Sequence, residues 1–288
     1  MRQLIRDRVG LGWRSELAPA ILSHLDEIDV VEVIIDDYFK QPLAKLRPLK
    51  LLENQVDVIY HGVGLGLASS IPVPQKNLDN LARVFDYLEP KCWSEHLAFV
   101  RAGNIEIGHL AAPPRTQATI EGTLDNLKRV KHVVGSLPAL ENIATLIDPP
   151  GSTLLESEWT TAILQQSGCK LLLDLHNLYS NALNFDFDPV AYLKTFPLDL
   201  VELVHLSGGK WISEPAGFTG KRLLDDHVHG VPEAVFQLLA VLAKNTSQPL
   251  TVMIERDGEY PPFSTLLNEI KQAKAILQEA RQYECAIL

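Results

Sequence analysis

Imidazole, carboxylate and amide side chains recur at the ends of short apolar runs in this sequence. At the ends of these runs and in one loop they include His61, Glu95, His96, Glu141, Asn142, Asp174, His176, Asn177, His205, Asp225, Asp226, His227, His229, Glu255 and Asp257, and about nine of them are plausible metal ligands. Their donor atoms are nitrogen and oxygen, a set that suits iron, manganese or zinc and argues against copper(I) or a thiolate site. One ion takes about four to six ligands. Nine side chains therefore predict a cluster of two or three metal ions.

Each of these residues also has an ordinary structural interpretation. A lone histidine near a strand end is more often a hydrogen-bonded structural residue, and an aspartate often caps a helix. His24, His109 and His132 lie in predicted helix or loop positions, and we assign them this structural role. The other six of the nine histidines fall on the segments that also carry the carboxylates, which favours a shared site.

Eight short, apolar and often β-branched runs alternate with longer amphipathic stretches. We predict strands at residues 8–13, 30–35, 57–62, 92–99, 138–142, 170–177, 202–208 and 251–257. Strands buried on both faces have this character, and alternation of strand and helix implies a parallel sheet. Eight repeats favour a closed (β/α)8 TIM barrel over an open doubly wound sheet, which stays the alternative. Because no low-complexity linker divides the chain, we predict one TIM-barrel domain over residues 1–288.

A barrel explains how the polar residues can meet, since the carboxyl ends of all its strands face one mouth. In chain order, they lie at the end of the third strand (His61), in the fourth (Glu95, His96), at the ends of the fifth (Glu141) and sixth (Asp174, His176, Asn177), in the seventh (His205), in the loop that follows (Asp225, His227, His229) and at the end of the eighth (Glu255). Buried charges are costly unless they are paired. Metal cations among the carboxylates would offset that cost.

Composition and charge exclude several classes of protein. The net charge is -10, whereas a domain that grips nucleic acid is usually basic, so we predict no nucleic-acid partner. The apolar runs are too short to cross a bilayer and no signal peptide is apparent, so we predict a cytoplasmic protein without membrane association. The three cysteines, Cys92, Cys169 and Cys285, form no CxxC pair, which argues against a disulfide framework.

Two other motifs carry little weight. The segment HGVGLGLASS follows a predicted strand and faintly resembles a dinucleotide-binding loop. Pro72 and Pro74 follow too soon for the helix that such a loop requires. We expect instead that its small residues let the backbone pass close to a site after His61. No G-x-S-x-G sequence is present to support a serine hydrolase.

Nine segments, in order over about residues 8 to 275, resemble one family. They are GLGWRSELAPAIL, VVEVIIDDYF, HGVGLGL, WSEHLAF, LENI, LLLDLHNLYSNALN, ELVHLSG, LLDDHVHGVPEAV and MIERDGEYPP. The sequence is similar to the multinuclear non-heme iron-dependent oxidases, which include the methanobactin-biosynthesis oxidase. The resemblance implies a xylose-isomerase-like barrel with two or three irons at its mouth.

The resemblance also implies a ligand set and a reaction. The ligands would be His61, His96 and Glu141 for one iron; Glu141, Asp174, His205 and Glu255 for a second; and Asn177, Asp225 and His227 for a third, more labile iron. Relatives use dioxygen to oxidise a residue, often cysteine, of a ribosomally made precursor peptide, which a separate partner protein commonly presents. Glu95, beside His96, is our candidate catalytic residue, to orient ligands or move a proton.

Three positions depart from the family pattern. His176 stands where relatives usually carry asparagine, Gly66 stands where serine is usual, and His229 is an additional possible ligand. These departures bear on the substrate and on occupancy of the third metal site more than on the cluster itself.

Three other functions stay open at the level of sequence. The first is a divalent-metal sugar isomerase or epimerase on the same barrel, with manganese or zinc in place of iron. The second is a trinuclear zinc DNA-repair endonuclease, which the acidic charge disfavours. The third is a non-catalytic binding module that keeps a relic of the site.

Overall fold

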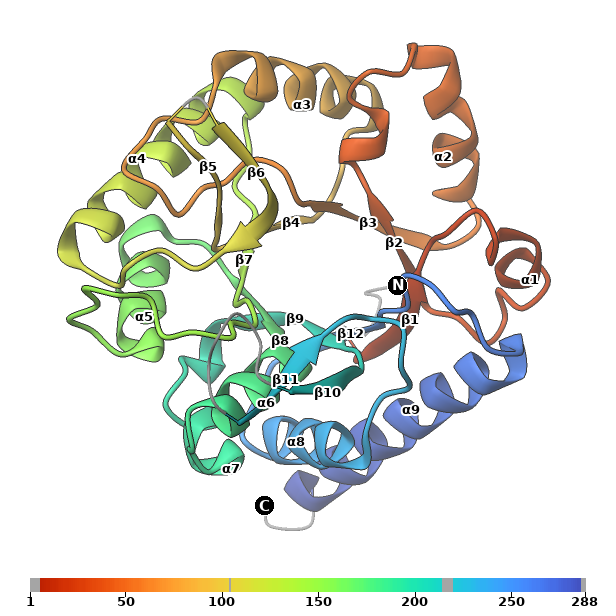
Figure 1. Ribbon diagram of the computed structural model, residues 1–288. Coiled ribbons are helices and arrows are strands. Elements are labelled where there is room, and N and C mark those ends of the chain that lie inside the picture. The colour runs from red at the N-terminus through yellow and green to blue at the C-terminus, as the bar shows by residue number, and fades with distance from the viewer. Residues whose placement is uncertain (1–5, 104, 214–219, 286–288) are drawn as a thin grey trace. The chain divides into compact units, whose positions relative to one another are not determined.

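The computed structural model describes residues 6–103, 105–213 and 220–285 (Figure 1). Eight parallel strands form a closed barrel in the order β1-β12-β9-β8-β7-β4-β3-β2, which confirms the predicted fold class. The bounds of these strands are β1 Arg8–Gly12, β2 Val30–Ile34, β3 Asp57–Gly62, β4 Trp93–His96, β7 Ala139–Glu141, β8 Leu171–Asp174, β9 Val201–Leu206 and β12 Thr251–Ile254. Each of the eight lies within or next to a predicted strand.

Helices follow most of the barrel strands. Their bounds are α1 Ala18–Leu22, α2 Arg47–Leu52, α3 Gln75–Leu88, α4 Gln117–Val134, α5 Glu156–Ser167, α6 Leu175–Asn184, α7 Pro189–Leu193, α8 Glu233–Lys244 and α9 Phe263–Cys285, with short 3-10 turns at η1 Asp36–Tyr38, η2 Leu43–Leu46 and η3 Leu198–Leu200. Local sequence sets their ends. Thr116 and Thr119 form a capping box at the start of α4, and Gly135 ends that helix with a φ of 87°.

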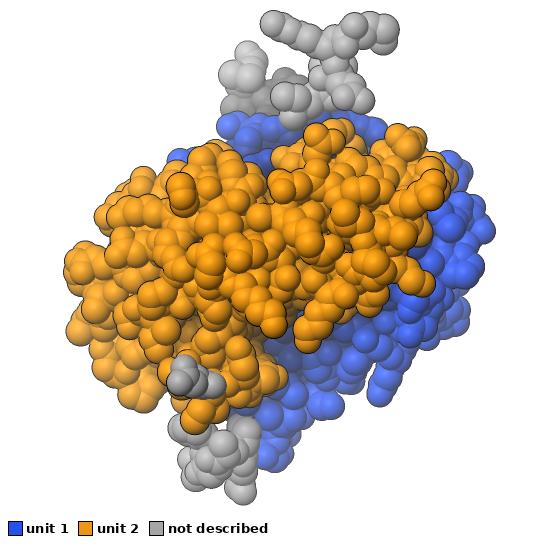
Figure 2. All heavy atoms as spheres, turned by 90° about the horizontal axis from the view of Figure 1, so that it is seen from above, with its two compact units in different colours: residues 1–31, 144–146, 172–288 blue, residues 32–143, 147–171 orange. Residues whose placement is uncertain are grey.

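The chain divides into two compact units, which Figure 2 colours separately. The first unit comprises residues 1–31, 144–146 and 172–288. Within it, β12 lies between β1 and β9 in parallel register. Helix α9 packs against β1 and β12, and α8 packs against α9 (Figure 1). All four residues of β12 are buried, as the apolar run TVMI predicts.

The second unit comprises residues 32–143 and 147–171. Within it, β4 lies between β3 and β7 in parallel register, so the carboxyl ends of these three strands share one edge. Helix α4 packs against α3 and against α5. The prediction of a single domain stays a prediction. Among the described residues, no helix has both the length and the apolar character needed to cross a lipid bilayer.

One predicted strand is wrong in its second half. We expected residues 170–177 to be extended, but β8 ends at Asp174 and α6 begins at Leu175. The Asp174 side chain accepts a hydrogen bond of 2.6 Å from the backbone N–H of Asn177 and thereby caps the helix. His176 and Asn177 therefore lie in the first turn of α6 and do not end a strand. The change from strand to helix occurs at one residue, without a glycine or proline to mark it.

Two antiparallel hairpins were missed. One pairs β5 Phe99–Ala102 with β6 Ile105–Ala111, and the other pairs β10 Gly209–Ser213 with β11 Lys221–Asp225. His109 lies in β6, where we expected a helix or loop, and Asp225 is the last residue of β11, where we expected a loop. The first five residues of β6 are exposed, so the strand lacks the half-buried alternation by which sequence patterns reveal strands.

At Gly10, β1 packs so closely against the backbone of β2 that a side chain has no room. A Cβ atom at this position would lie 1.6 Å from the carbonyl oxygen of Val30. We expect Gly10→Ala to lower the free energy of unfolding by about 3 kcal/mol, roughly 6 to 12 °C in melting temperature. Gly258→Ala is the control, because the added methyl group would meet only the movable Cγ1 of Val228 at 3.3 Å. Equal melting temperatures for both variants would contradict the prediction.

Candidate metal centre

The second unit gathers three candidate ligand side chains at one edge of its sheet. His61, His96 and Glu141 lie at the carboxyl ends of β3, β4 and β7, and their ligand atoms all lie within 4.8 Å of one another. The Nε2 atom of His61 is 3.5 Å from Glu141 Oε2, and the Nε2 atom of His96 is 3.3 Å from the same oxygen. All three side chains are buried. This group offers two imidazole nitrogens and one carboxylate to a single cation.

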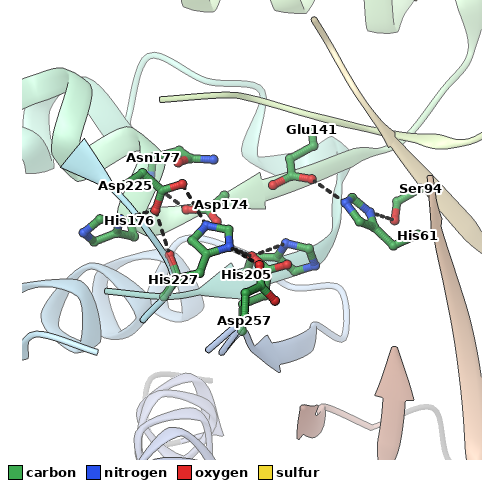
Figure 3. A network of polar contacts seen from close by, with 12 residues as sticks. His61, Ser94, Glu141, Asp174, His176, Asn177, His205, Asp225, His227 and Asp257 are labelled. Atoms are coloured by element: carbon green, nitrogen blue, oxygen red, sulfur yellow. Dashed lines mark hydrogen bonds and ion pairs between the residues drawn. The ribbon is translucent and has the colours of Figure 1, made fainter. Parts of the chain in front are cut away.

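The other ring nitrogen of each histidine is held by a hydrogen bond. His61 Nδ1 lies 2.8 Å from the hydroxyl oxygen of Ser94, as Figure 3 shows, and His96 Nδ1 lies 3.2 Å from the carbonyl oxygen of Gly62. A carbonyl only accepts, so His96 donates from Nδ1 and keeps the lone pair of Nε2 toward Glu141. Metal-binding histidines are typically oriented in this way.

Ser94 provides a test of this orientation. We expect Ser94→Ala to weaken metal binding at the His61 group about 10- to 100-fold, because the His61 ring loses the hydrogen bond that fixes its Nδ1 atom. Ser136→Ala is the matched control, since that hydroxyl accepts a hydrogen bond from Trp93 Nε1 at 3.0 Å. Competition with a chromophoric chelator measures the affinity. If the two variants bind metal equally well, Ser94 does not orient a ligand.

The first unit gathers a second group of buried ligands. Asp174, His205 and Glu255 have ligand atoms that all lie within 4.8 Å of one another. The Nδ1 atom of His205 is 3.2 Å from Glu255 Oε2. Because Oδ1 of Asp174 caps α6, the orientation of this carboxylate is fixed by the helix that follows it. These residues are at most 4% exposed, so a charge on any of them requires compensation.

Asp225 and His227 form a third group, also in the first unit. Figure 3 shows His176 and His227 on either side of Asp225. Asp225 Oδ2 is 2.7 Å from His227 Nε2, while Asp225 Oδ1 accepts hydrogen bonds from His176 Nδ1 at 2.8 Å and from Ser207 Oγ at 3.2 Å. Asn177, the remaining predicted ligand of the third ion, is buried in the first turn of α6.

Electrostatics in this third group favours charged forms. Burial acts to raise the pKa of Asp225, but the hydrogen bonds from His176 and His227 lower that pKa to about 2. Burial opposes the charged form of His227, yet the nearby carboxylates of Glu255, Asp225 and Asp257 raise the pKa of His227 well above its usual value. The nearby carboxylates thus favour positive charge at the position of the His227 ring, which also suits a metal cation.

Glu95 lies behind the ligands of the second unit. Its Oε2 accepts a hydrogen bond of 3.2 Å from the N–H of Leu65, and its Oε1 accepts one of 3.0 Å from the N–H of His96. The same Oε1 is 3.8 Å from His96 Nδ1. The carboxylate therefore joins the loop after β3 to the backbone of the candidate ligand His96.

The glycine-rich segment after His61 is fixed by charged side chains that the sequence analysis did not single out. Asp36 accepts hydrogen bonds of 2.9 Å from the N–H groups of Val63 and Gly64, and Arg101 donates to the carbonyl oxygens of Gly64 and Leu65. Burial and the neighbouring Glu95 raise the pKa of Asp36 to about 6. Since carboxylates already engage these N–H groups, the loop is not arranged to bind phosphate.

Sequence reasoning also missed Ser94, Ser207 and the role of Asp257. Asp257, at the end of the eighth predicted strand, accepts from His227 Nδ1 at 3.0 Å through its Oδ2 and from Arg14 Nε at 3.0 Å through its Oδ1. His229, the additional possible ligand, contacts Asp226 at 2.9 Å. No sequence signal relates Ser94, Ser207 or Asp257 to its partner, because the partners lie 33, 18 and 30 residues away in the chain.

Comparison with known proteins shows the family. Residues 8–278 match the family described as RiPP precursor modification enzyme MbnB/TglH/ChrH. The chain belongs to this family. Among curated relatives, a UPF0276 protein of Streptomyces avermitilis is 33% identical over 94% of this chain, which spans 55% of that relative. A UPF0276 protein of Acaryochloris marina is 31% identical, over 94% of this chain and 95% of the relative.

Solved structures similar to this MbnB/TglH/ChrH family member share its fold. An L-ribulose 3-epimerase has a TM-score of 0.60 at 14% identity and covers 98% of both chains. A xylose isomerase-like TIM barrel protein of Mycobacterium smegmatis, in complex with magnesium, has a TM-score of 0.56 at 11% identity and covers 95% of this chain and 97% of that one. Likeness at this identity establishes the xylose-isomerase-like barrel and nothing about the substrate.

Proposed function

We propose that this protein is a multinuclear non-heme iron-dependent oxidase that uses dioxygen to modify a residue, often cysteine, of a ribosomally made peptide. The observation that carries the proposal is the pair of buried ligand groups at strand ends, His61, His96 and Glu141 in one unit and Asp174, His205 and Glu255 in the other. They occur in a chain whose family modifies RiPP precursors.

The proposed arrangement has two or three irons. His61, His96 and Glu141 would hold one iron; Asp174, His205 and Glu255 would hold a second; and Asn177, Asp225 and His227 would hold the third. The donor set of imidazole and carboxylate suits iron, with manganese and zinc as alternatives. Glu141, Asp174, Asp225 and Glu255 supply four negative charges, which two divalent ions would neutralise. When bound, iron supplies a Lewis acid and a redox centre.

The residues of this chain have three tasks in that proposal. The buried ligands would keep water from the centre, because all of the residues in the first two groups are at most 8% exposed. Ser94 and the Gly62 carbonyl keep the histidine rings turned toward Glu141. Glu95 accepts the backbone N–H of His96 at 3.0 Å and so orients this residue, and it is our candidate group to move a proton.

The proposal extends to partners and location. The substrate is a precursor peptide, presented by a separate partner protein, and the reaction takes place in the cytoplasm. Neither nucleic acid nor membrane takes part, in keeping with the net charge of -10. The peptide itself is best sought among short, cysteine-rich reading frames beside the gene for this protein.

The deciding experiment measures oxygen consumption by protein loaded anaerobically with ferrous iron. We expect uptake of dioxygen that requires both iron and a precursor peptide encoded beside the gene, with a mass change in the peptide. Protein loaded with magnesium or manganese is the control. Conversion of a ketose by the manganese form, without oxygen uptake by the iron form, would replace the oxidase by a sugar epimerase of the kind that shares this barrel.

A further inference from the structure

The carboxylate of Asp225 is held from one side by two donors of the same unit. Its Oδ1 accepts from His176 Nδ1 in α6 at 2.8 Å and from Ser207 Oγ at 3.2 Å, whereas its Oδ2 is 2.7 Å from His227 Nε2. The two oxygens thus have separate tasks. Oδ1 anchors the side chain to α6 and to the residue after β9, and Oδ2 faces an imidazole nitrogen, the kind of atom that shares a cation with a carboxylate.

His176 is fitted to this anchoring task. Its side chain is fully buried, and its Nε2 atom has no hydrogen-bond partner among the described residues. A carboxylate only accepts, so the proton of the ring lies on Nδ1 and points at Asp225. The ring fits because Gly209 faces it: a Cβ atom there would lie 2.6 Å from His176 Cε1. The ring is therefore confined to the orientation in which Nδ1 reaches Asp225.

The other ring nitrogen of His227, Nδ1, is also held by a hydrogen bond. Its Nδ1 contacts Asp257 Oδ2 at 3.0 Å, and Asp257 is bound in turn by Arg14. The backbone of His227 has a φ of 55°, a conformation that costs energy for a residue other than glycine. The side chain of Asp225 is thus fixed by His176 and Ser207, and that of His227 by Asp257. These contacts set the positions of Asp225 Oδ2 and His227 Nε2.

We propose that His176 is a positioning residue: its Nδ1–H fixes Asp225 so that Oδ2 and His227 Nε2 form one prepared face of a divalent-cation site. This inference rests on the proposed function for the third ion and adds the residue that determines its affinity. An asparagine at position 176 keeps an N–H donor near the place of Nδ1. A glutamine carries its donor one bond further along, and a leucine carries none.

The test uses zinc, which can bind to the site without a change of oxidation state. Zinc binding to the full chain is measured by calorimetry and by elemental analysis, with Asp225→Asn identifying the binding step that depends on Asp225. We expect His176→Leu and His176→Gln to weaken that step about 10- to 100-fold and to leave the other steps unchanged. His176→Asn should restore it to within a few-fold of the wild type.

Three results would overturn the inference. The first is wild-type zinc affinity in both His176→Leu and His176→Gln. The second is that His176→Asn weakens zinc binding as much as those two variants do. The third is that no zinc-binding step is lost in Asp225→Asn. If His176→Leu does not fold, the polar pair of His176→Asn and His176→Gln decides alone, since both keep a polar side chain of similar size. Oxygen uptake plays no part in this test, so a protein that binds zinc as expected but consumes no oxygen would refute the oxidase and not the role of His176.

Discussion

The Asp174→Ala variant is expected to purify with fewer metal ions per chain and to lose at least about 100-fold in turnover, more than outer residues of a metal site usually contribute. Asp174 is fully buried, and its ligand oxygen lies within 4.8 Å of those of His205 and Glu255. Without Asp174, only His205 and Glu255 of this group would remain as ligands of the ion. Metal content is measured by elemental analysis and turnover by mass spectrometry of the peptide.

The control must separate loss of a ligand from loss of a helix cap. Asp174 caps α6, and substitution of a capping aspartate by alanine typically costs about 1 kcal/mol. Asp188 caps α7 in the same way, accepting from Ala191 N–H at 2.7 Å, but is exposed. Asp188→Ala should therefore lose stability while keeping its metal and turnover.

The Glu255→Gln variant should also lose turnover completely, whereas Glu202→Gln, at an exposed position of β9, should not. Full activity of Asp174→Ala or Glu255→Gln would sink the assignment.

Removal of the metal is expected to lower the melting temperature substantially. An ion that binds only the folded state contributes about 4 kcal/mol when its free concentration is 1,000 times the dissociation constant. That corresponds to roughly 8 to 16 °C for a protein of this size. The physical reason is that the buried carboxylates of Glu141, Asp174 and Glu255 lose the cations that compensate their charge.

The measurement is a thermal melt before and after anaerobic treatment with a chelator, followed by return of ferrous iron. The Glu141→Gln variant serves as the comparison, because it lacks the carboxylate that both His61 and His96 face and should respond less to the chelator. A wild-type melting temperature that is the same with and without metal would show that these buried groups are satisfied without an ion.

The barrel strands could be predicted from the sequence because each one is a short, mostly apolar run of residues. The strands Leu171–Asp174 and Thr251–Ile254 are mostly apolar and buried along their whole length, and such runs recur with helices between them. The hairpins and α6 were not open to prediction in this way. The β5–β6 hairpin is largely exposed along β6, and α6 begins directly at a strand end, where Asp174 serves both elements.

The sequence named candidate ligands of a metal site, but it did not predict how their side chains are oriented. His61, His96 and Glu141 were named from residue type and position at strand ends, and the tertiary structure brings their ligand atoms together. His176 illustrates the limit. It was singled out only as a departure from relatives, and we placed it at a strand end; its place in α6, turned toward Asp225, depends on a helix that was not predicted.

The amino-acid sequence by itself determined which side chains this protein has for metal chemistry, and that a parallel barrel would bring strand ends to one mouth. Both follow from local patterns of residue type and hydrophobicity. Only the tertiary structure decided which nitrogen of each histidine is turned to a carboxylate and which residue holds the other nitrogen. Ser94 is 33 residues from His61, Asp225 is 49 from His176, and Asp257 is 30 from His227. Contacts over such separations follow from strand register and hairpin geometry, which residue patterns along the chain do not encode one by one.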